Sequence, residues 1–262
     1  MVAFEKMNGA GNDFIVVDAR ELAVLPSPMQ ISQLCDRRFG VGADGLLLLL
    51  PTTTAGCHFS MSYYNSDGSE ASMCGNGGRC IAYFAYCLGL ADADSRTHLR
   101  FTAGDGVHDA FILPDEGRNK RVRLSMRNTA PFYHCLDGMF IDTGVPHYVQ
   151  AVENLDAFDV ASEGRRLRSH PAIGLQGANV DFTQMRGDGS IYVRTYERGV
   201  EGETWACGTG VTAAAIVHQA HRVVTRGGCF EVDYDTASDG SCSHVWLTGP
   251  VEVNFSGTTN II

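Results

Sequence analysis

Two of the nine cysteines in this sequence of 262 residues lie in the same short motif, Cys-Gly-x-Gly. The motif occupies residues 74–77 and 207–210, and an apolar run follows each copy. Glycines before a helix let the chain turn and leave the first backbone N–H groups open, and these donors bind anions with the help of the helix dipole. The same field lowers the pKa of a cysteine. A single motif would usually mean a buried cysteine at a turn, but two matched copies indicate a pair of working thiols.

Two thiols that face one carbon from opposite sides could exchange a proton there. An α-carboxylate bound by both helix starts would place its α-carbon between Cys74 and Cys207. One sulfur could then remove the α-proton while the other returned a proton to the opposite face. We therefore expect a cleft between two halves of the chain and acid–base chemistry on an amino acid.

The cysteine motifs belong to a longer internal repeat. The offset from Gly9 to Gly144, and again from Gly42 to Gly177, is 135 residues, and the offset between the two cysteines is 133 residues. Tyrosine followed by a polar residue, at residues 64–65 and 196–197, precedes each cysteine motif. Three matched segments in the same order predict two homologous halves.

Each half is expected to be mostly β-structure around one helix. Residues 58–63, 121–126 and 191–196 alternate between apolar and polar side chains, as half-buried strands do. Residues 79–88 and 211–220 are apolar on nearly every face, which is typical of a buried helix. A turn-rich cluster at residues 114–119 marks the expected boundary between the halves, residues 1–117 and 118–249.

Composition excludes several classes of function. A net charge of −10 argues against nucleic-acid binding, which needs a basic face. The sequence has neither the ~20-residue apolar stretch of a membrane span nor a secretory signal, so we expect a cytoplasmic protein without a membrane partner. Nine cysteines without C-x-x-C spacing argue against a disulfide framework or a metal site. With Lys6 and Lys120 as its only lysines, the chain offers little for a pyridoxal-phosphate Schiff base.

Taken together, the motifs resemble those of the diaminopimelate epimerases over essentially the whole chain. The matching segments are residues 6–14, 38–45, 64–70, 73–77, 178–180, 196–199 and 206–210. The resemblance implies that the protein interconverts LL- and meso-diaminopimelate without a cofactor, on the route to lysine and peptidoglycan. It further implies an α+β fold of two pseudo-symmetric domains, each a mixed, mostly antiparallel, barrel-like sheet around a central helix. The C-terminal segment 250–262 should return to the first domain, and the protein should be a homodimer.

The resemblance also assigns roles to individual residues. It makes Cys74 and Cys207 the acid–base pair. The residues expected to hold the reacting carboxylate are Gly75, Asn76, Gly208 and Thr209. The residues expected to recognise the charged groups of the substrate are Asn12, Asn65, Asn179, Glu197 and Arg198.

These residue types suit a diamino diacid. Arg198 can grip a carboxylate at two points, and Glu197 can neutralise an ammonium group. His147 is expected near the cysteines as an orienting group, although a buried structural role is equally compatible with the sequence. Many members of the family have glutamine where Gly45 stands and asparagine where Val145 stands, so substrate recognition could differ in detail.

Other functions remain open at this point. Cysteine pairs would also suit another cofactor-independent racemase, such as a proline racemase. A thiol hydrolase with His147 as its base would not explain the second cysteine, and a redox or metal-binding protein would not explain the amino-acid-binding residues. Incubation with diaminopimelate in deuterated water should separate these possibilities, since only an epimerase labels the α-carbon.

Overall fold

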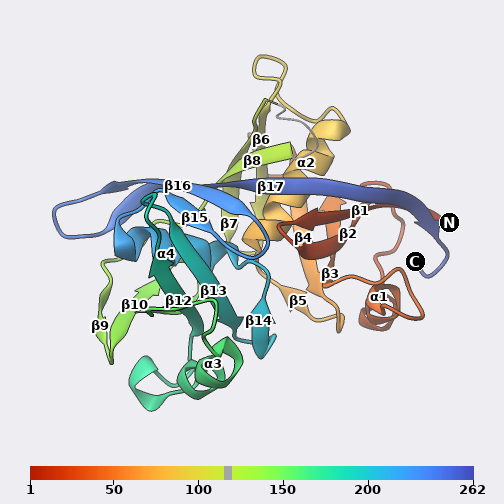
Figure 1. Cartoon of the computed structure of the whole chain (residues 1–262). Coiled ribbons are helices and arrows are strands. Elements are labelled where there is room, and N and C mark those ends of the chain that lie inside the picture. Colours follow the sequence, from red (N-terminus) through yellow and green to blue (C-terminus); the bar gives the residue numbers. More distant parts are fainter. Residues whose placement is uncertain (115–119) are drawn as a thin grey trace. The chain divides into compact units, whose positions relative to one another are not determined.

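The computed structural model describes residues 1–114 and 120–262, which divide into two compact units (Figure 1). Unit 1 contains residues 1–124 and 250–262, and unit 2 contains residues 125–249. The predicted boundary between residues 117 and 118 lies outside the described residues. Across the described ranges, no helix is both long and apolar enough to span a membrane.

Unit 1 is a closed ring of eight strands. The eight strands are β1 (Val2–Gly9), β2 (Asn12–Asp18), β3 (Gly45–Leu50), β4 (Phe59–Asn65), β6 (His98–Ala103), β7 (Gly106–Ile112), β8 (Lys120–Ser125) and the last part of β17 (Cys242–Thr259). The short strand β5 (Glu70–Ala71) pairs with β4. The ring runs β17–β1–β2–β3–β4–β6–β7–β8, and β8 also pairs with β17. The pairs β2–β3 and β4–β6 are parallel, whereas β1–β2, β3–β4 and β6–β7 are antiparallel.

Helix α2 (Gly75–Cys87) fills this ring. It contacts β1, β2, β3, β4, β6 and β7, and ten of its thirteen residues are buried. The strands around it are correspondingly apolar: leucines 46–49 of β3 are all completely buried. Burying each such side chain contributes about 1.5–3 kcal/mol. Helix α1 (Pro28–Cys35) covers the outside of the sheet with Ile31 and Leu34, and a capping box between Ser27 and Gln30 fixes its start.

Unit 2 repeats the same pairing pattern. Its strands are β9 (Tyr133–Cys135), β10 (Gly138–Asp142), β11 (Pro146–Ala151), β12 (Asn179–Met185), β13 (Ile191–Glu197), β14 (Gly202–Thr204), β15 (Arg222–Val224), β16 (Cys229–Thr236) and the first part of β17. They pair in the order β9–β10–β11–β12–β13–β15–β16–β17, with β11–β12 and β13–β15 parallel. Helix α4 (Gly208–His218) contacts β10, β11, β12, β13, β15 and β16.

The internal repeat is therefore visible in the topology. In each unit a helix outside the sheet, α1 or α3 (Val160–Arg168), lies between the first two parallel strands in the chain. A short hairpin, β4–β5 or β13–β14, then leads directly into the central helix. The prediction of an α+β fold with barrel-like sheets around buried helices is confirmed.

The predicted starts of the two central helices were too late. Helix α2 begins at Gly75 rather than at residue 79, and α4 begins at Gly208 rather than at residue 211. Glycine is a poor helix former, so propensity alone disfavours these positions. Packing inside the sheet overrides that preference and extends both helices back to the cysteines.

Candidate active site

Cys74 caps the N-terminus of α2. Its backbone is extended, with φ −141° and ψ 122°, and its carbonyl accepts the first helical hydrogen bond from Gly78 N–H at 2.7 Å. The half-buried thiol makes no capping bond to the helix backbone. Backbone N–H groups in the first turn of a helix have no acceptor within the helix, so they can bind an anion beside the sulfur.

Cys207 occupies the same place at α4. It has φ −108° and ψ 114°, and its carbonyl accepts a hydrogen bond from Val211 N–H at 2.8 Å. Its thiol is also unused for capping, but the residue is only 7% exposed. The structure thus places both predicted catalytic residues at equivalent N-caps of matched helices.

The glycines after each cysteine belong to the helices and do not form a sharp turn. Gly75, Gly77, Gly208 and Gly210 all lie in helical backbone. A Cβ atom added at Gly210 would lie 2.3 Å from the carboxylate of Asp181, and one at Gly77 would lie 3.1 Å from the Leu47 side chain. The prediction that these glycines make a tight turn is wrong, because none of the four has a positive φ, and at Gly210 the limiting factor is space.

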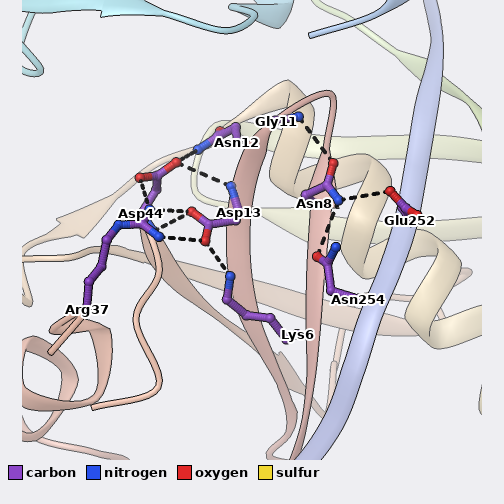
Figure 2. Close-up of polar contacts among 9 residues, drawn as sticks. All are labelled: Lys6, Asn8, Gly11, Asn12, Asp13, Arg37, Asp44, Glu252 and Asn254. Atoms are coloured by element: carbon purple, nitrogen blue, oxygen red, sulfur yellow. Dashed lines mark hydrogen bonds and ion pairs between the residues drawn. The ribbon is translucent and has the colours of Figure 1, made fainter. Parts of the chain in front are cut away.

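In unit 1, the thiol of Cys74 faces the amide of Asn12. Asn12 is the first residue of β2, and its Oδ1 accepts from Cys74 Sγ at 3.6 Å and from Asn76 Nδ2 at 3.3 Å. Its Nδ2 donates to Asp44 at 2.8 Å (Figure 2). Asn12, Cys74 and Asn76, all predicted as site residues, therefore form one hydrogen-bonded group.

A buried guanidinium supports this group from within the helix. Arg79 is fully buried, and it donates to Asn76 Oδ1 at 2.9 Å and to Gly75 O at 3.1 Å. Burial lowers the pKa of Arg79 to about 10, while the neighbouring thiols of Cys80 and Cys74 act in the opposite direction. At neutral pH the group still carries its charge, so a cation lies one turn beyond Cys74.

In unit 2, a chain of hydrogen bonds links Cys207 to a buried carboxylate. Cys207 Sγ lies 3.3 Å from Thr209 Oγ1, and Thr209 Oγ1 lies 2.9 Å from His147 Nε2. His147 Nδ1 lies 2.6 Å from Asp181, which also accepts from Thr195 Oγ1 at 2.7 Å. Since a carboxylate accepts hydrogen bonds, the His147 proton lies on Nδ1 and its Nε2 accepts from Thr209. His147 is completely buried and, as predicted, lies beside this cysteine site.

The electrostatic surroundings of Cys207 oppose its ionisation. Burial raises the pKa of Cys207 well above its usual value, and the carboxylates of Glu197 and Asp181 raise it further. Burial likewise raises the pKa of Glu197, against the effect of a hydrogen bond from Thr204. For Cys207 the prediction of a lowered pKa is wrong, because burial and two nearby carboxylates outweigh the field of the helix start.

Asn179, Arg198 and Glu197 lie at neighbouring strand ends in unit 2. Asn179 begins β12, where its Nδ2 is 3.3 Å from His147 Nε2 and its Oδ1 accepts from Arg198 N–H at 2.8 Å. The Arg198 guanidinium lies 3.3 Å from the carbonyls of Gln176 and Gly177. These contacts join Asn179 to the His147 group, whereas the charged end of Arg198 lies against a loop.

Asn65 is not joined to Cys74 by its own side-chain contacts. It ends β4, where its Oδ1 accepts from Tyr63 at 3.0 Å and its Nδ2 donates to Ser69 at 3.1 Å. Both bonds belong to the hairpin that leads to α2. Its role towards a substrate stays a prediction.

Two sequence departures from the family pattern have different surroundings. Gly45 leaves no room for a side chain, because an added Cβ would lie 2.5 Å from the Tyr64 carbonyl and 2.7 Å from the Tyr63 ring. A glutamine there would require the sheet to shift. Val145 is half-buried, and its carbonyl accepts from Thr143 N–H at 3.2 Å.

Three charged residues in contact with the predicted site residues were not identified from the sequence: Asp44, Arg79 and Asp181. Asp181 stands between Val180 and Phe182 in an apolar strand, and Arg79 opens an apolar helical run. For Asp181 and Arg79 the sequence did contain a signal, namely a single charged residue within an apolar strand or helix. A charge that is buried in this way must find polar partners. Among the described residues, no group of three or more histidine, cysteine, aspartate or glutamate side chains could hold a metal ion.

The chain matches the family described as diaminopimelate epimerase at residues 4–112 and 139–256. The diaminopimelate epimerase of Flavobacterium psychrophilum is 40% identical over 263 residues, covering 97% of this chain and 98% of the relative. That of Chlorobaculum tepidum is 38% identical over 269 residues, covering 97% of this chain and 100% of the relative.

Solved structures with low sequence identity share the fold. A phenazine biosynthesis protein of the PhzF family from Bacillus anthracis has a TM-score of 0.74 at 15% identity, covering 98% of each chain. A probable proline racemase from Agrobacterium radiobacter has a TM-score of 0.73 at 16% identity, covering 100% of this chain and 94% of the other. The family match and the two epimerases at 40% and 38% identity go further than this shared fold: the chain belongs to the diaminopimelate epimerase family.

Proposed function

We propose that this protein is a diaminopimelate epimerase, an isomerase that interconverts LL- and meso-diaminopimelate without a cofactor. The observation that carries the proposal is the pair of cysteines at equivalent N-caps of two matched helices, in a chain of this family. The repeat supplies two equivalent thiols, and a two-base reaction needs two such groups. A hydrolase with a single nucleophile would not explain the second thiol.

In the proposed reaction, one cysteine acts as the base and the other as the acid. A thiolate removes the α-proton and becomes a thiol, which leaves a carbanion at the α-carbon. The second thiol donates its proton to the opposite face and becomes the thiolate. Configuration is thereby inverted, no electrons are exchanged, and the reverse reaction exchanges the roles of Cys74 and Cys207. Each enzyme molecule then recovers its first protonation state by proton transfer with solvent.

The backbone of each helix start is proposed to hold the reacting carboxylate. In this proposal, N–H groups in the first turn of each helix would donate to the negative charge that grows as the α-proton leaves. The residues that supply them are Gly75, Asn76, Gly208 and Thr209. The same donors would stabilise the carbanion, because its charge spreads onto that carboxylate.

The charged ends of the substrate are proposed to meet polar side chains at the strand ends. Glu197 suits an ammonium group, Arg198 suits a carboxylate, and the amides can serve either. The three amide residues are Asn12, Asn65 and Asn179. His147 is proposed to orient Thr209 and, through it, the Cys207 thiol.

The cellular setting is part of the proposal. Diaminopimelate is a precursor of lysine and peptidoglycan, so we place the protein in the cytoplasm, without a nucleic-acid or membrane partner. We further propose that it acts as a homodimer.

Deuterium incorporation tests the proposed function. The purified protein, with a thiol reductant, would be incubated in deuterated water with LL-diaminopimelate and, separately, with the meso form. Both should gain one deuterium at an α-carbon as they interconvert. Proline and 4-hydroxyproline serve as comparison substrates, because proline-type racemases share the fold. Exchange with proline instead of diaminopimelate would replace this proposal with a proline-type racemase, and no exchange with any of them would reject the epimerase.

A further inference from the structure

We propose that Asp44, held in place by Arg37, is a positioning residue that keeps the Asn12 amide turned with its oxygen towards the Cys74 thiol. The inference rests on the proposed function, in which Asn12 and Cys74 both act on the substrate. Asp44 itself contacts neither the thiol nor the helix start in the hydrogen bonds that define this group.

Asp44 is fixed by several contacts around its carboxylate (Figure 2). Its Oδ1 accepts from Arg37 Nη2 at 2.9 Å, and its Oδ2 accepts from Asn12 Nδ2 at 2.8 Å and from Asp13 N–H at 3.2 Å. Its own N–H donates to Asp13, at 3.0 Å from the carbonyl and 3.1 Å from the side chain. These hydrogen bonds thus join the start of β2 to the loop before β3 at the Asp44 carboxylate.

Asp13 anchors the other side of Arg37. Arg37 reaches both oxygens of the Asp13 carboxylate, at 2.7 Å and 3.0 Å, and Lys6 binds one of them. Burial acts to raise the pKa of Asp13, but the hydrogen bonds and charges of Arg37 and Lys6 outweigh it and lower the value to about 2. The Asp13 carboxylate therefore stays ionised near neutral pH, and Arg37 binds it and Asp44 together.

The Asn12 amide is fixed from both ends. An ionised carboxylate only accepts hydrogen bonds, so the side of Asn12 that faces Asp44 must be the NH2 group. At the far end, Arg79 only donates, so Asn76 must turn its oxygen to Arg79 and its NH2 group to Asn12. A flipped Asn12 would bring two NH2 groups together and would leave Asp44 facing an oxygen.

The orientation of the Asn12 amide determines which of its atoms faces the Cys74 thiol. In the fixed orientation the thiol faces an acceptor oxygen at 3.6 Å, which favours the S–H form and directs its proton. In the flipped orientation the sulfur would face an NH2 group, which favours the thiolate. The Asp44–Arg37 pair thereby controls the protonation of a thiol with which it has no direct bond.

A double-mutant cycle tests the proposal. The rate at which iodoacetamide alkylates Cys74 would be followed by peptide mass spectrometry at pH 7.5 without substrate. We expect Asp44→Asn to raise this rate about tenfold, the size of one exchanged hydrogen bond to a charged group. In the Asn12→Ala background the same substitution should change the rate less than about twofold, since no amide is left to orient. An equal change in both backgrounds, or none in either, would overturn the proposal.

The controls separate positioning from folding and from the proposed function. Asp18→Asn removes a carboxylate at the end of β2 that pairs with Arg20 at 2.6 Å, and it should leave the alkylation rate of Cys74 unchanged. If Asp44→Asn does not fold, Arg37→Gln at a half-exposed side chain replaces it, with an expected change of about threefold that again disappears with Asn12→Ala. Alkylation needs no substrate, so the coupling stands or falls independently of deuterium exchange with diaminopimelate. Where exchange occurs, Asp44→Asn should also lower its kcat.

Discussion

The two cysteine sites share one backbone arrangement and differ in the charges around it. Cys74 is half-buried and bonds to the neutral amide of Asn12, and a buried arginine lies one turn along its helix. Cys207 is buried, bonds to the hydroxyl of Thr209, and lies among the negative charges of Glu197 and Asp181. Unit 1 thus surrounds its thiol with amides and a cation, whereas unit 2 surrounds its thiol with carboxylates.

The same contrast appears five residues after each cysteine. Arg79 donates to Gly75 O at 3.1 Å, and its counterpart Thr212 donates to Gly208 O at 3.0 Å. One position thus keeps its contact with the helix start but exchanges a cation for a neutral hydroxyl. A two-base reaction needs one thiolate and one thiol at the start of each turnover. In unit 2, burial and the two carboxylates oppose the ionisation of Cys207.

Removing either thiol should have the largest effect. Cys74→Ala and Cys207→Ala should each lower kcat by at least about 10³-fold in both directions, since every turnover needs one acid and one base. The measurement is α-proton exchange and inversion, starting from each stereoisomer of diaminopimelate. Cys87→Ala and Cys229→Ala, at exposed cysteines, should retain wild-type rates. Near-native inversion by either site variant would show that the two sites do not act as a pair.

Breaking the hydrogen-bond chain of unit 2 should have the next largest effect. At this fully buried position, Asp181→Asn replaces a carboxylate, which only accepts hydrogen bonds, by an amide, which both donates and accepts them. The proton of His147 is then no longer fixed on Nδ1. We expect kcat to fall about 10- to 100-fold, the loss typical of one or two hydrogen bonds to a charged group. Thr195→Val removes one donor to Asp181 and leaves His147 bonded, so its effect on kcat should be smaller. Equal losses would mean that Asp181 matters for the fold of unit 2 and not for His147.

Much of the fold could be predicted from the sequence, for identifiable reasons. The alternation at residues 121–126 and the apolar run at residues 211–220 reflect burial, and burial controls local structure. For residues 191–196 the prediction of a half-buried strand is wrong, because all six residues of this stretch of β13 are buried. The matched offsets of the glycine and cysteine segments revealed the repeat, because both copies must pack their helix in the same way. Helix starts were less predictable, because close packing around Gly75 and Gly208 outweighs the low helix propensity of glycine.

The candidate site was predictable only where a residue type points directly to chemistry. Cysteines at helix starts, and asparagines in matching segments, gave such signals. The partners Asp44, Arg79 and Asp181 act through distances that only the folded chain defines. The pKa of Cys207 was predicted in the wrong direction for the same reason: the helix start was visible in the sequence, but the approach of Glu197 was not.

Removing a carboxylate beside Cys207 should sharpen the electrostatic contrast. Because the negative charge of Glu197 adds to the raised pKa of the Cys207 thiol, Glu197→Gln should lower that pKa and increase the thiolate fraction at a given pH. A fall of one unit would accelerate alkylation of Cys207 about tenfold at pH 7.5. Alkylation of each cysteine would be followed separately by peptide mass spectrometry. A rate at Cys207 that did not change would mean that burial and Asp181 hold the thiol protonated without help from Glu197.

The smallest expected effect concerns stability, where the two units should respond to pH in opposite directions. In unit 1, burial acts to lower the pKa of His98, but bonds to Asp109 at 2.8 Å and Asp92 at 2.6 Å outweigh it and raise the value. In unit 2, burial lowers the pKa of His218, whose Nε2 lies 2.8 Å from Thr183. A raised pKa stabilises the fold below the unfolded value of about 6.5, and that stabilisation is lost as the pH rises through the folded pKa. A lowered pKa gives stabilisation above about 6.5 that is lost as the pH falls.

Hydrogen exchange of backbone amides in α2 and α4 can report on the two units separately. The His98→Gln variant should destabilise α2 most at pH 5.5 and progressively less towards pH 8, because the bonds of the charged imidazole matter only while it is protonated. The His218→Gln variant should destabilise α4 relatively more at pH 8 than at pH 5.5, because the neutral ring is the form that the buried site accepts. Each pH-dependent part should stay below about 1 kcal/mol, since solvent screens partly exposed groups. Comparing each variant with the wild type at the same pH cancels the intrinsic pH dependence of exchange. If the destabilisation changed with pH in the same direction in α2 and α4, the opposite pKa shifts of His98 and His218 would not control the stability of the two units.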